Sequence, residues 1–176
     1  MVDSSWMIDN DRLVATLNEL GVCYIAGDSE AQPYTDLTPA QIIAAMMTCG
    51  AVRVEYAVIP LVIRRPEFAA AIPEAISNLP PDLAEQLRRH YTAAVYLQRM
   101  YLPALELYLG RKPFLVDLFS ATMNLPSPDD YYGEIGLREM ISRLPPPINW
   151  WHSYLDPLWM FIRTLSLEKT YGWQIH

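Results

Sequence analysis

Two residues near the C-terminal end have the types and the spacing for acid–base chemistry. His152 and Asp156 lie four positions apart, a spacing that places two side chains on one face of a helix. A carboxylate that orients a histidine is half of a general-base arrangement. Because no GxSxG motif and no nearby cysteine supplies a nucleophile, the alternative is an exposed pair on a helix surface.

A second group of polar residues surrounds a predicted turn. Asp129, Asp130 and Glu134 flank Tyr131 and Tyr132, and paired acids can bind a divalent cation or transfer protons. Their spacing is not that of an EF-hand loop. The alternative is a set of acids ahead of a helix start, where the helix dipole stabilises negative charge.

Two arginine doublets are candidates for binding an anion. Arg64-Arg65 and Arg88-Arg89 could hold a phosphate if the fold brings them together. Separately, the first doublet suits the last turn of a helix, where cations are favoured. Arg89 also lies four residues after Glu85, the spacing of a helical ion pair.

The sequence offers little for metal or cofactor binding. Cys23 and Cys49 are the only cysteines, and one of the three histidines is the C-terminal residue. The chain has no HExxH motif, no paired Cys/His spacing and no glycine-rich phosphate loop. We therefore expect no metal site and no cofactor.

The chain is rich in aromatic residues, with 11 Tyr, 5 Trp and 4 Phe. Such side chains anchor interfaces because they bury a large area at low entropic cost. They are dense in the last predicted helix, where an apolar stripe recurs at helical spacing. We expect this stripe to cover either the chain's own core or a second copy of the chain. The interface candidates are Trp150, Trp151, Tyr154, Leu158, Trp159 and Ile162.

Helical periodicity dominates the elements that must position these residues. It predicts an all-α fold, a compact bundle of about seven helices joined by short connections. The clearest helix start is Thr38-Pro39, because Gln41 completes a capping box there. The predicted helices cover 10–20, 38–49, 66–79, 83–109, 115–124, 133–144 and 148–167.

Two predicted helices contain prolines at informative positions. Residues 52–65 are rich in β-branched side chains, which suit a strand, but Pro60 would interrupt a central strand. A kinked, buried helix is the preferred interpretation. Helix 83–109 is the longest, opens with a predicted capping box of Asp82 and Glu85, and should be bent by Pro103.

The expected domain organisation has two parts. Residues 1–144 form a helical domain. Residues 145–176 form a C-terminal helix that Pro145-Pro146-Pro147, a stiff extended spacer, separates from this domain. This helix packs on the domain or on a partner subunit.

Charge and hydropathy exclude several classes of protein. The 176-residue chain has a net charge of −7, and only two of its 13 basic residues are lysines, so it is a poor match for the phosphate backbone of nucleic acids. The longest apolar stretch is far shorter than the ~20 residues of a membrane span. The start of the chain lacks the basic residues of a secretory signal. We expect a cytoplasmic protein with reduced thiols, bound to neither nucleic acid nor membrane.

Two resemblances to known proteins accompany these patterns. The run from Gly50-Ala51-Val52-Arg53 to Pro66-Glu67 resembles the second helix of a HEAT repeat. The wider chain, including residues 91–99 and Pro126-Ser127-Pro128, looks like a group of bacterial all-helical proteins of unknown function. Neither resemblance implies any catalytic or binding residue.

The sequence therefore favours a non-catalytic, helical interaction or regulatory protein that self-associates, as a homodimer. The alternative is a small-molecule-binding protein or a small enzyme with an aromatic pocket between helices. A deep aromatic pocket in the monomer would favour a ligand, whereas a flat apolar face would favour a protein partner.

Overall fold

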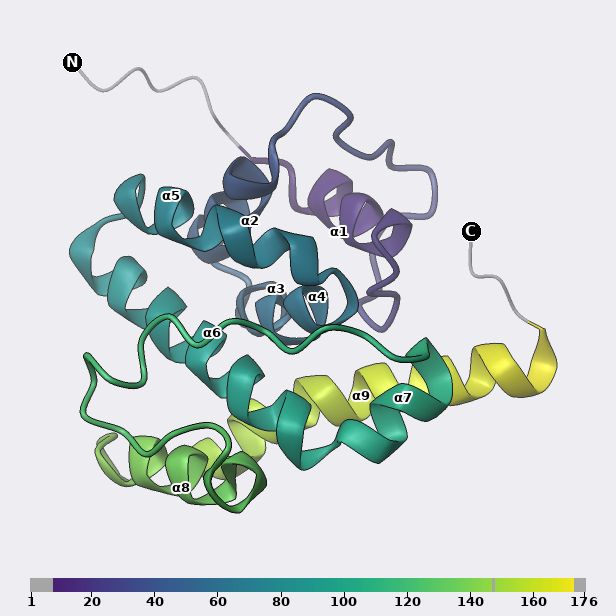
Figure 1. The fold of residues 1–176 in the computed structure, drawn as a ribbon. Coiled ribbons are helices and arrows are strands. Elements are labelled where there is room, and N and C mark those ends of the chain that lie inside the picture. The colour runs from purple at the N-terminus through teal and green to yellow at the C-terminus, as the bar shows by residue number, and fades with distance from the viewer. Residues whose placement is uncertain (1–7, 147, 173–176) are drawn as a thin grey trace.

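Helices are the regular elements throughout the part of the chain that the computed structural model describes, residues 8–146 and 148–172 (Figure 1). The fold is all-α, and its helix number is close to the expected seven. The elements in chain order are α1 (Asn10–Glu19), α2 (Pro39–Thr48), α3 (Val52–Tyr56), α4 (Val58–Arg64), η1 (Pro66–Ala71), α5 (Ile72–Ser77), α6 (Pro81–Met100), α7 (Leu102–Leu109), η2 (Asp130–Gly133), α8 (Glu134–Ser142) and α9 (Trp150–Tyr171), where η marks a 3-10 helix.

Side-chain caps fix the starts of the first two helices. The Asp9 carboxylate accepts hydrogen bonds from the backbone N–H groups of Asp11 and Arg12 at the start of α1. At the start of α2, the Thr38 and Gln41 side chains each accept from the other's backbone N–H, so the predicted capping box is confirmed. Both caps satisfy N–H groups that have no partner inside the helix.

Residues 52–65 are helical, as preferred, but the break lies three residues before the proline. Helix α3 ends at Tyr56 and α4 begins at Val58, with Ala57 between them. Pro60 cannot donate to the carbonyl four residues earlier and its ring clashes with that group. Since this carbonyl belongs to Tyr56, the helix must restart so that Pro60 falls in the first turn of α4.

The long helix predicted over 83–109 is bent before Pro103, as expected. The bend is sharp enough to separate α6 from α7 at Tyr101, which has φ −110° and ψ 18°. The start differs from the prediction. Helix α6 begins at Pro81, and Asp82 lies inside its first turn without capping it, because Pro81 already provides a favourable first helical residue.

Two other prolines divide the helix predicted over 66–79. Pro66 opens the 3-10 helix η1, and Pro73 lies in the first turn of α5. Neither position needs the missing N–H group. The segment is thus helical throughout most of its length, but in two pieces.

The prediction of a short helix over 115–124 is wrong. Residues 112–118 form no regular element and residues 119–124 form turns. The chain is held along α6 by three hydrogen bonds from side chains of that helix. Gln98 accepts from the Leu115 N–H (2.7 Å) and donates to the Pro113 carbonyl (3.0 Å), and the Tyr91 hydroxyl donates to the Val116 carbonyl (2.8 Å). These bonds use backbone groups that a helix would need for itself.

Helix α6 is the centre of the molecule. It packs against α4 and α5 on one side and against α8, η2 and α9 on the other (Figure 1). Its residues from His90 to Gln98 are all buried. A helix that is apolar nearly all round is typical of such a central position.

Helix α9 packs on its own chain. It contacts α3, α4, α6, α7 and α8, and it runs beneath α6 and α7 from one end of the molecule to the other (Figure 1). The Trp150 indole N–H donates to the Pro145 carbonyl (2.9 Å), which fixes the start of the helix to the proline-rich connection.

Candidate interaction site

The three acids around residue 130 do not converge. The Asp129 carboxylate pairs with the Arg99 guanidinium (2.9 Å), and Glu134 pairs with Arg138 one helical turn away (2.7 Å). Asp130 is exposed. Among the described residues, no three His, Cys, Asp or Glu side chains lie close enough together to hold a metal ion.

The two tyrosines between these acids are the unusual feature of the site. Tyr131 and Tyr132 both have left-handed backbone conformations, with φ 47° and 55°. Side chains other than glycine, asparagine and aspartate rarely adopt this region because Cβ crowds the following carbonyl. Both rings are nevertheless exposed, by 75% and 81%. Two large side chains on strained backbone are therefore exposed to solvent, where they contribute little to the core.

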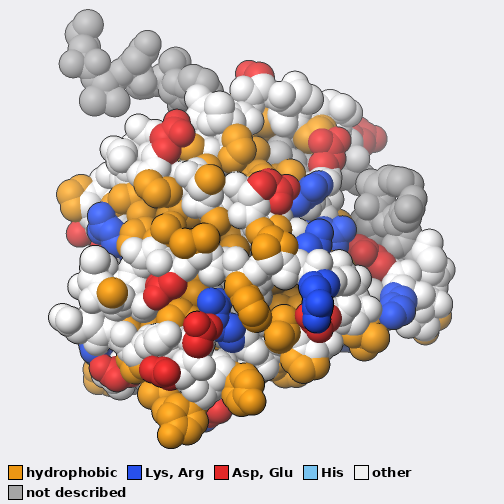
Figure 2. All heavy atoms as spheres, in the orientation of Figure 1, with side chains coloured by type: hydrophobic (Ala, Val, Ile, Leu, Met, Phe, Trp, Pro, Cys, Tyr) orange, Lys and Arg blue, Asp and Glu red, His pale blue; other side chains and the backbone are white. Residues whose placement is uncertain are grey.

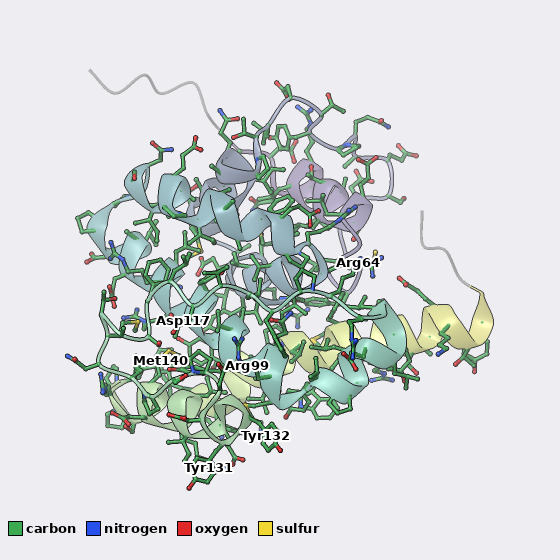
Figure 3. The ribbon with its side chains drawn as sticks, in the orientation of Figure 1. Arg64, Arg99, Asp117, Tyr131, Tyr132 and Met140 are labelled. Carbon is green, nitrogen blue, oxygen red and sulfur yellow. The ribbon has the colours of Figure 1, made fainter. Side chains whose placement is uncertain are left out.

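Tyr96 of α6 fixes the turn that carries these tyrosines. Its hydroxyl donates to the Pro126 carbonyl (2.8 Å) ahead of the turn. A Cβ atom on Gly133 would lie 2.7 Å from the Tyr96 carbonyl oxygen, and one on Gly136 would overlap the Tyr96 ring. Only glycine fits at both positions, so the turn and the start of α8 lie directly on α6 (Figure 3).

Further exposed apolar side chains lie next to this turn. Arg99, which binds Asp129, also lies 4.7 Å from the centre of the Phe114 ring in a cation–π contact. Phe114 and the nearby Val116 are 50% and 63% exposed. We name this set the tyrosine surface: Phe114, Val116, Tyr131 and Tyr132.

The two tyrosines of this surface can be located in Figure 3. Tyr131 and Tyr132 project outward from the molecule, with Arg99 behind them (Figure 3). On the face seen in Figure 2, hydrophobic side chains are interspersed with acidic and basic ones. Tyrosine and arginine are the residue types that dominate binding energy at protein interfaces.

Most of the interface candidates in α9 are buried or half-buried within the chain itself. Tyr154, Leu158 and Ile162 are buried by at least 93%. Trp150 and Trp151 are half-buried, and the Arg138 guanidinium lies over the Trp151 ring (4.6 Å). Trp159 is the candidate that stays 52% exposed, with its ring edge-to-face against Tyr101.

His152 and Asp156 are both exposed on α9, and no hydrogen bond joins them in the described part of the chain. Asp156 lines a cavity of about 270 Å³ between α9, α3 and the segment before α2. Tyr24 and Tyr56 also line this cavity, and the buried Tyr24 hydroxyl has no hydrogen-bond partner. Tyr24 and Tyr56 are the aromatic residues among its lining, which also includes Arg53 and Ser153.

The structure separates the two arginine doublets. Arg64 packs against Gly21, whose φ is +89°, and Arg65 donates to the Leu20 carbonyl (3.4 Å), so the first doublet holds the end of α1. The second doublet, Arg88-Arg89, lines a different cavity, with Arg143 of α8.

Sequence reasoning selected the acids of the 129–134 segment and passed over the tyrosines between them. Their left-handed conformation is not predicted by the residue type, because tyrosine rarely adopts it. The nearest available signal is the closely spaced Pro126, Pro128 and Gly133, which predicts turns but not exposure.

Comparison with known proteins gives no relative from which residues could be transferred: no protein family, curated protein or solved structure matches the chain. None of the helices in the described residues combines the length and the hydropathy that crossing a bilayer demands.

Proposed function

We propose that this chain is a non-catalytic interaction protein that self-associates as a homodimer through the tyrosine surface. The observation that carries the proposal is the pair Tyr131 and Tyr132, two consecutive exposed rings on left-handed backbone. Such conformations cost about 1–3 kcal/mol each and are concentrated at functional sites. In the monomer the exposed rings bury little apolar area, so they do not offset this conformational free energy. Burial of the rings against a partner would offset it.

The size of the surface supports a protein partner. Each aromatic side chain can bury about 150–250 Å², so Phe114, Tyr131 and Tyr132 supply a large share of the roughly 800 Å² that a standard interface buries on each partner. The tyrosine hydroxyls offer hydrogen bonds at the rim. No deep cleft is needed for this mode of binding.

The charges beside the tyrosine surface favour a second copy as the partner. Arg111 and Lys112 precede Phe114, whereas Asp129 and Asp130 precede the tyrosines. All four side chains are exposed. Asp129 and Arg111 are paired within the chain, with Arg99 and Glu106, whereas Lys112 and Asp130 form no ion pair in the described part of the chain. In a two-fold dimer the same surface meets itself, and Lys112 of one copy can face Asp130 of the other. We propose the cytoplasm as the location, which fits the free thiols Cys23 and Cys49.

Replacing both tyrosines with asparagine tests the proposal. Asparagine tolerates left-handed backbone, so the double variant Tyr131→Asn/Tyr132→Asn should be at least as stable as the wild type. It should also lose the dimer, because the rings that bind the partner are gone. Sedimentation equilibrium gives the mass of each protein, and chemical unfolding gives its stability.

The control replaces another exposed apolar side chain, Leu167, which is 44% exposed near the end of α9. Leu167→Gln should leave the dimer intact. A wild type that stays monomeric at all concentrations, or a double variant that dimerises as the wild type does, would contradict the proposal.

A further inference from the structure

A cavity outside the tyrosine surface brings three arginines together. It measures about 420 Å³ and lies between α6, α8 and the turn at residues 122–125. Arg88 and Arg89 reach it from α6, and Arg143 reaches it from the end of α8. The three lie up to 55 positions apart in the sequence, so only the packing of α8 on α6 places them side by side.

The acids at this cavity compensate only part of the positive charge. Glu85 pairs with both Arg88 (3.2 Å) and Arg89 (3.8 Å), and Glu139 pairs with Arg143. Three cations and two carboxylates leave one positive charge in excess. The whole chain has a net charge of −7, so this cavity is a local exception to the charge of the molecule.

The arginines also have unused donors. A guanidinium carries five N–H groups, whereas Arg88 makes one hydrogen bond, to Glu85, within the described part of the chain. Arg143 is held in place by the carbonyls of Met123 and Asn124 (2.6 and 2.7 Å) as well as by Glu139. One arginine is therefore fixed and another has free donors, a combination that suits an incoming anion.

The rest of the cavity lining is mainly apolar. It consists of Thr122 and the side chains of Met123, Leu125, Met140 and Leu144. An apolar lining with a few converging charged groups, at this volume, is typical of a small-molecule site. Inorganic ions would use the arginines but not the apolar lining.

We propose that this cavity binds a small organic anion, a carboxylate or phosphate group carried on a compact apolar body. The anionic group lies between Arg88 and Arg143 and accepts hydrogen bonds from both guanidinium groups. The apolar body lies against Met123, Leu125 and Met140. Glu85 competes with the ligand for Arg88, so its carboxylate weakens binding. The site is separate from the tyrosine surface and does not depend on dimerisation.

Calorimetric titration of the full chain with matched probes tests this site. Phenyl phosphate and phenylacetate carry the two kinds of anionic group on the same ring, benzyl alcohol has the ring without the charge, and inorganic phosphate has the charge without the ring. We expect saturable binding of phenyl phosphate or phenylacetate, and much weaker binding of the other two probes. The phosphate and carboxylate arms show which anionic group the site prefers.

Two variants should move the affinity in opposite directions. Arg88→Gln should weaken binding about tenfold, the factor that one charge-assisted hydrogen bond is worth. Glu85→Gln should strengthen it, because the competing carboxylate is removed. The control Arg163→Gln removes an exposed arginine of α9 and should leave the affinity unchanged.

Chemical-shift mapping on the wild type locates the bound probe without any substitution, and it should move the side-chain Nε–H signals of Arg88 and Arg143. The proposal is overturned if neither aromatic anion binds in the millimolar range. Equal binding of benzyl alcohol, shifts confined to other residues, or equal losses in Arg88→Gln and Arg163→Gln would overturn it as well.

Discussion

At the scale of single residues, His90 is the most perturbed group of the core. It is 1% exposed, and its ring lies 4.3 Å from the Tyr56 ring and 5.8 Å from the Tyr154 ring. Its Nε2 faces the Gln86 amide (3.4 Å), whereas its Nδ1 has no hydrogen-bond partner. Burial, together with the charge of neighbouring Arg89, lowers the pKa of His90 to about 3. The histidine is therefore neutral in the folded protein near neutral pH.

This buried histidine predicts a loss of stability in mild acid. The unfolded chain binds a proton at His90 below a pH of about 6.5, whereas the folded chain does so only near its lowered pKa of about 3. Stability should therefore fall as the pH drops from about 6.5 towards about 3, by up to about 1.4 kcal/mol per pH unit. Urea unfolding between about pH 7.5 and 5.5 measures this slope before most carboxylates titrate.

Two histidine variants separate this effect from others. His90→Phe keeps a ring between the two tyrosines and should flatten the slope. His152→Gln changes an exposed histidine and should leave the slope as it is in the wild type. A wild type whose stability is constant or rises over this pH range would refute the assignment.

Single residues also show where prediction from the sequence stops. The candidate anion site in the sequence combined Arg88 and Arg89 with Arg64 and Arg65, which the structure places elsewhere. The partner in the structure is Arg143, because α8 packs on α6 and α4 directs its arginines towards the end of α1. Which arginines come together depends on the packing of segments that are distant in the sequence, and the local spacing of residues does not predict that packing.

At the scale of elements, the extended segment 112–118 depends on one side chain of α6. Gln98 is 3% exposed, and its amide makes two hydrogen bonds to the backbone of Pro113 and Leu115. Gln98→Leu would leave both backbone groups without these partners, so we expect a destabilisation of about 1–3 kcal/mol. Chemical unfolding measures the loss, and amide hydrogen exchange at Leu115 should accelerate.

Gln98→Glu provides the matched comparison for this element. Its carboxylate can still accept from the Leu115 N–H, but it cannot donate to the Pro113 carbonyl. Leu115 should stay more protected from exchange than in Gln98→Leu. Equal exchange rates in the wild type and Gln98→Leu would show that the segment is held by other contacts.

A comparison of two segments shows which helices could be predicted from the sequence. Residues 38–49 carry a capping box, a proline at the first position and an apolar stripe, and all of these signals agree. Residues 115–124 have apolar side chains without such caps. Two of their backbone groups, the Leu115 N–H and the Val116 carbonyl, bond to side chains of α6, a helix that begins more than 30 positions earlier. Local signals therefore suffice for capped helices and fail where a distant helix supplies the hydrogen bonds.

At the scale of the whole molecule, α9 joins the parts of the fold. It contacts five other helices, and one side of it is buried along most of its length. The buried apolar residues are Tyr154, Leu155, Leu158, Phe161, Ile162 and Leu165. The spacing in the sequence predicts a stripe of Trp151, Tyr154, Leu155, Leu158, Ile162 and Leu165. The structure buries all of these against the chain's own core except Trp151, which is half-buried, and it also buries Phe161.

Removing α9 should therefore destabilise the entire protein. Burial of each large apolar side chain contributes about 1.5–3 kcal/mol, so the six side chains together are comparable to the roughly 5–15 kcal/mol that stabilise a typical domain. A chain truncated at Pro145 would also expose the surfaces of α4 and α7 that α9 covers. We expect it to unfold or aggregate, and any soluble fraction to differ in oligomeric state from the full chain.

Thermal unfolding followed by circular dichroism, with light scattering for the mass, compares the truncated and full-length chains. A smaller change provides the control, since Trp159→Gln removes a half-exposed ring beside the buried stripe of α9. This variant should keep the fold and change the melting temperature little, because only the edge-to-face contact with Tyr101 is lost. A truncated chain that melts at the same temperature and keeps the same mass would show that residues 10–144 fold independently of α9. The large loss expected instead follows from burial that α9 shares with five helices, which makes it part of a single core.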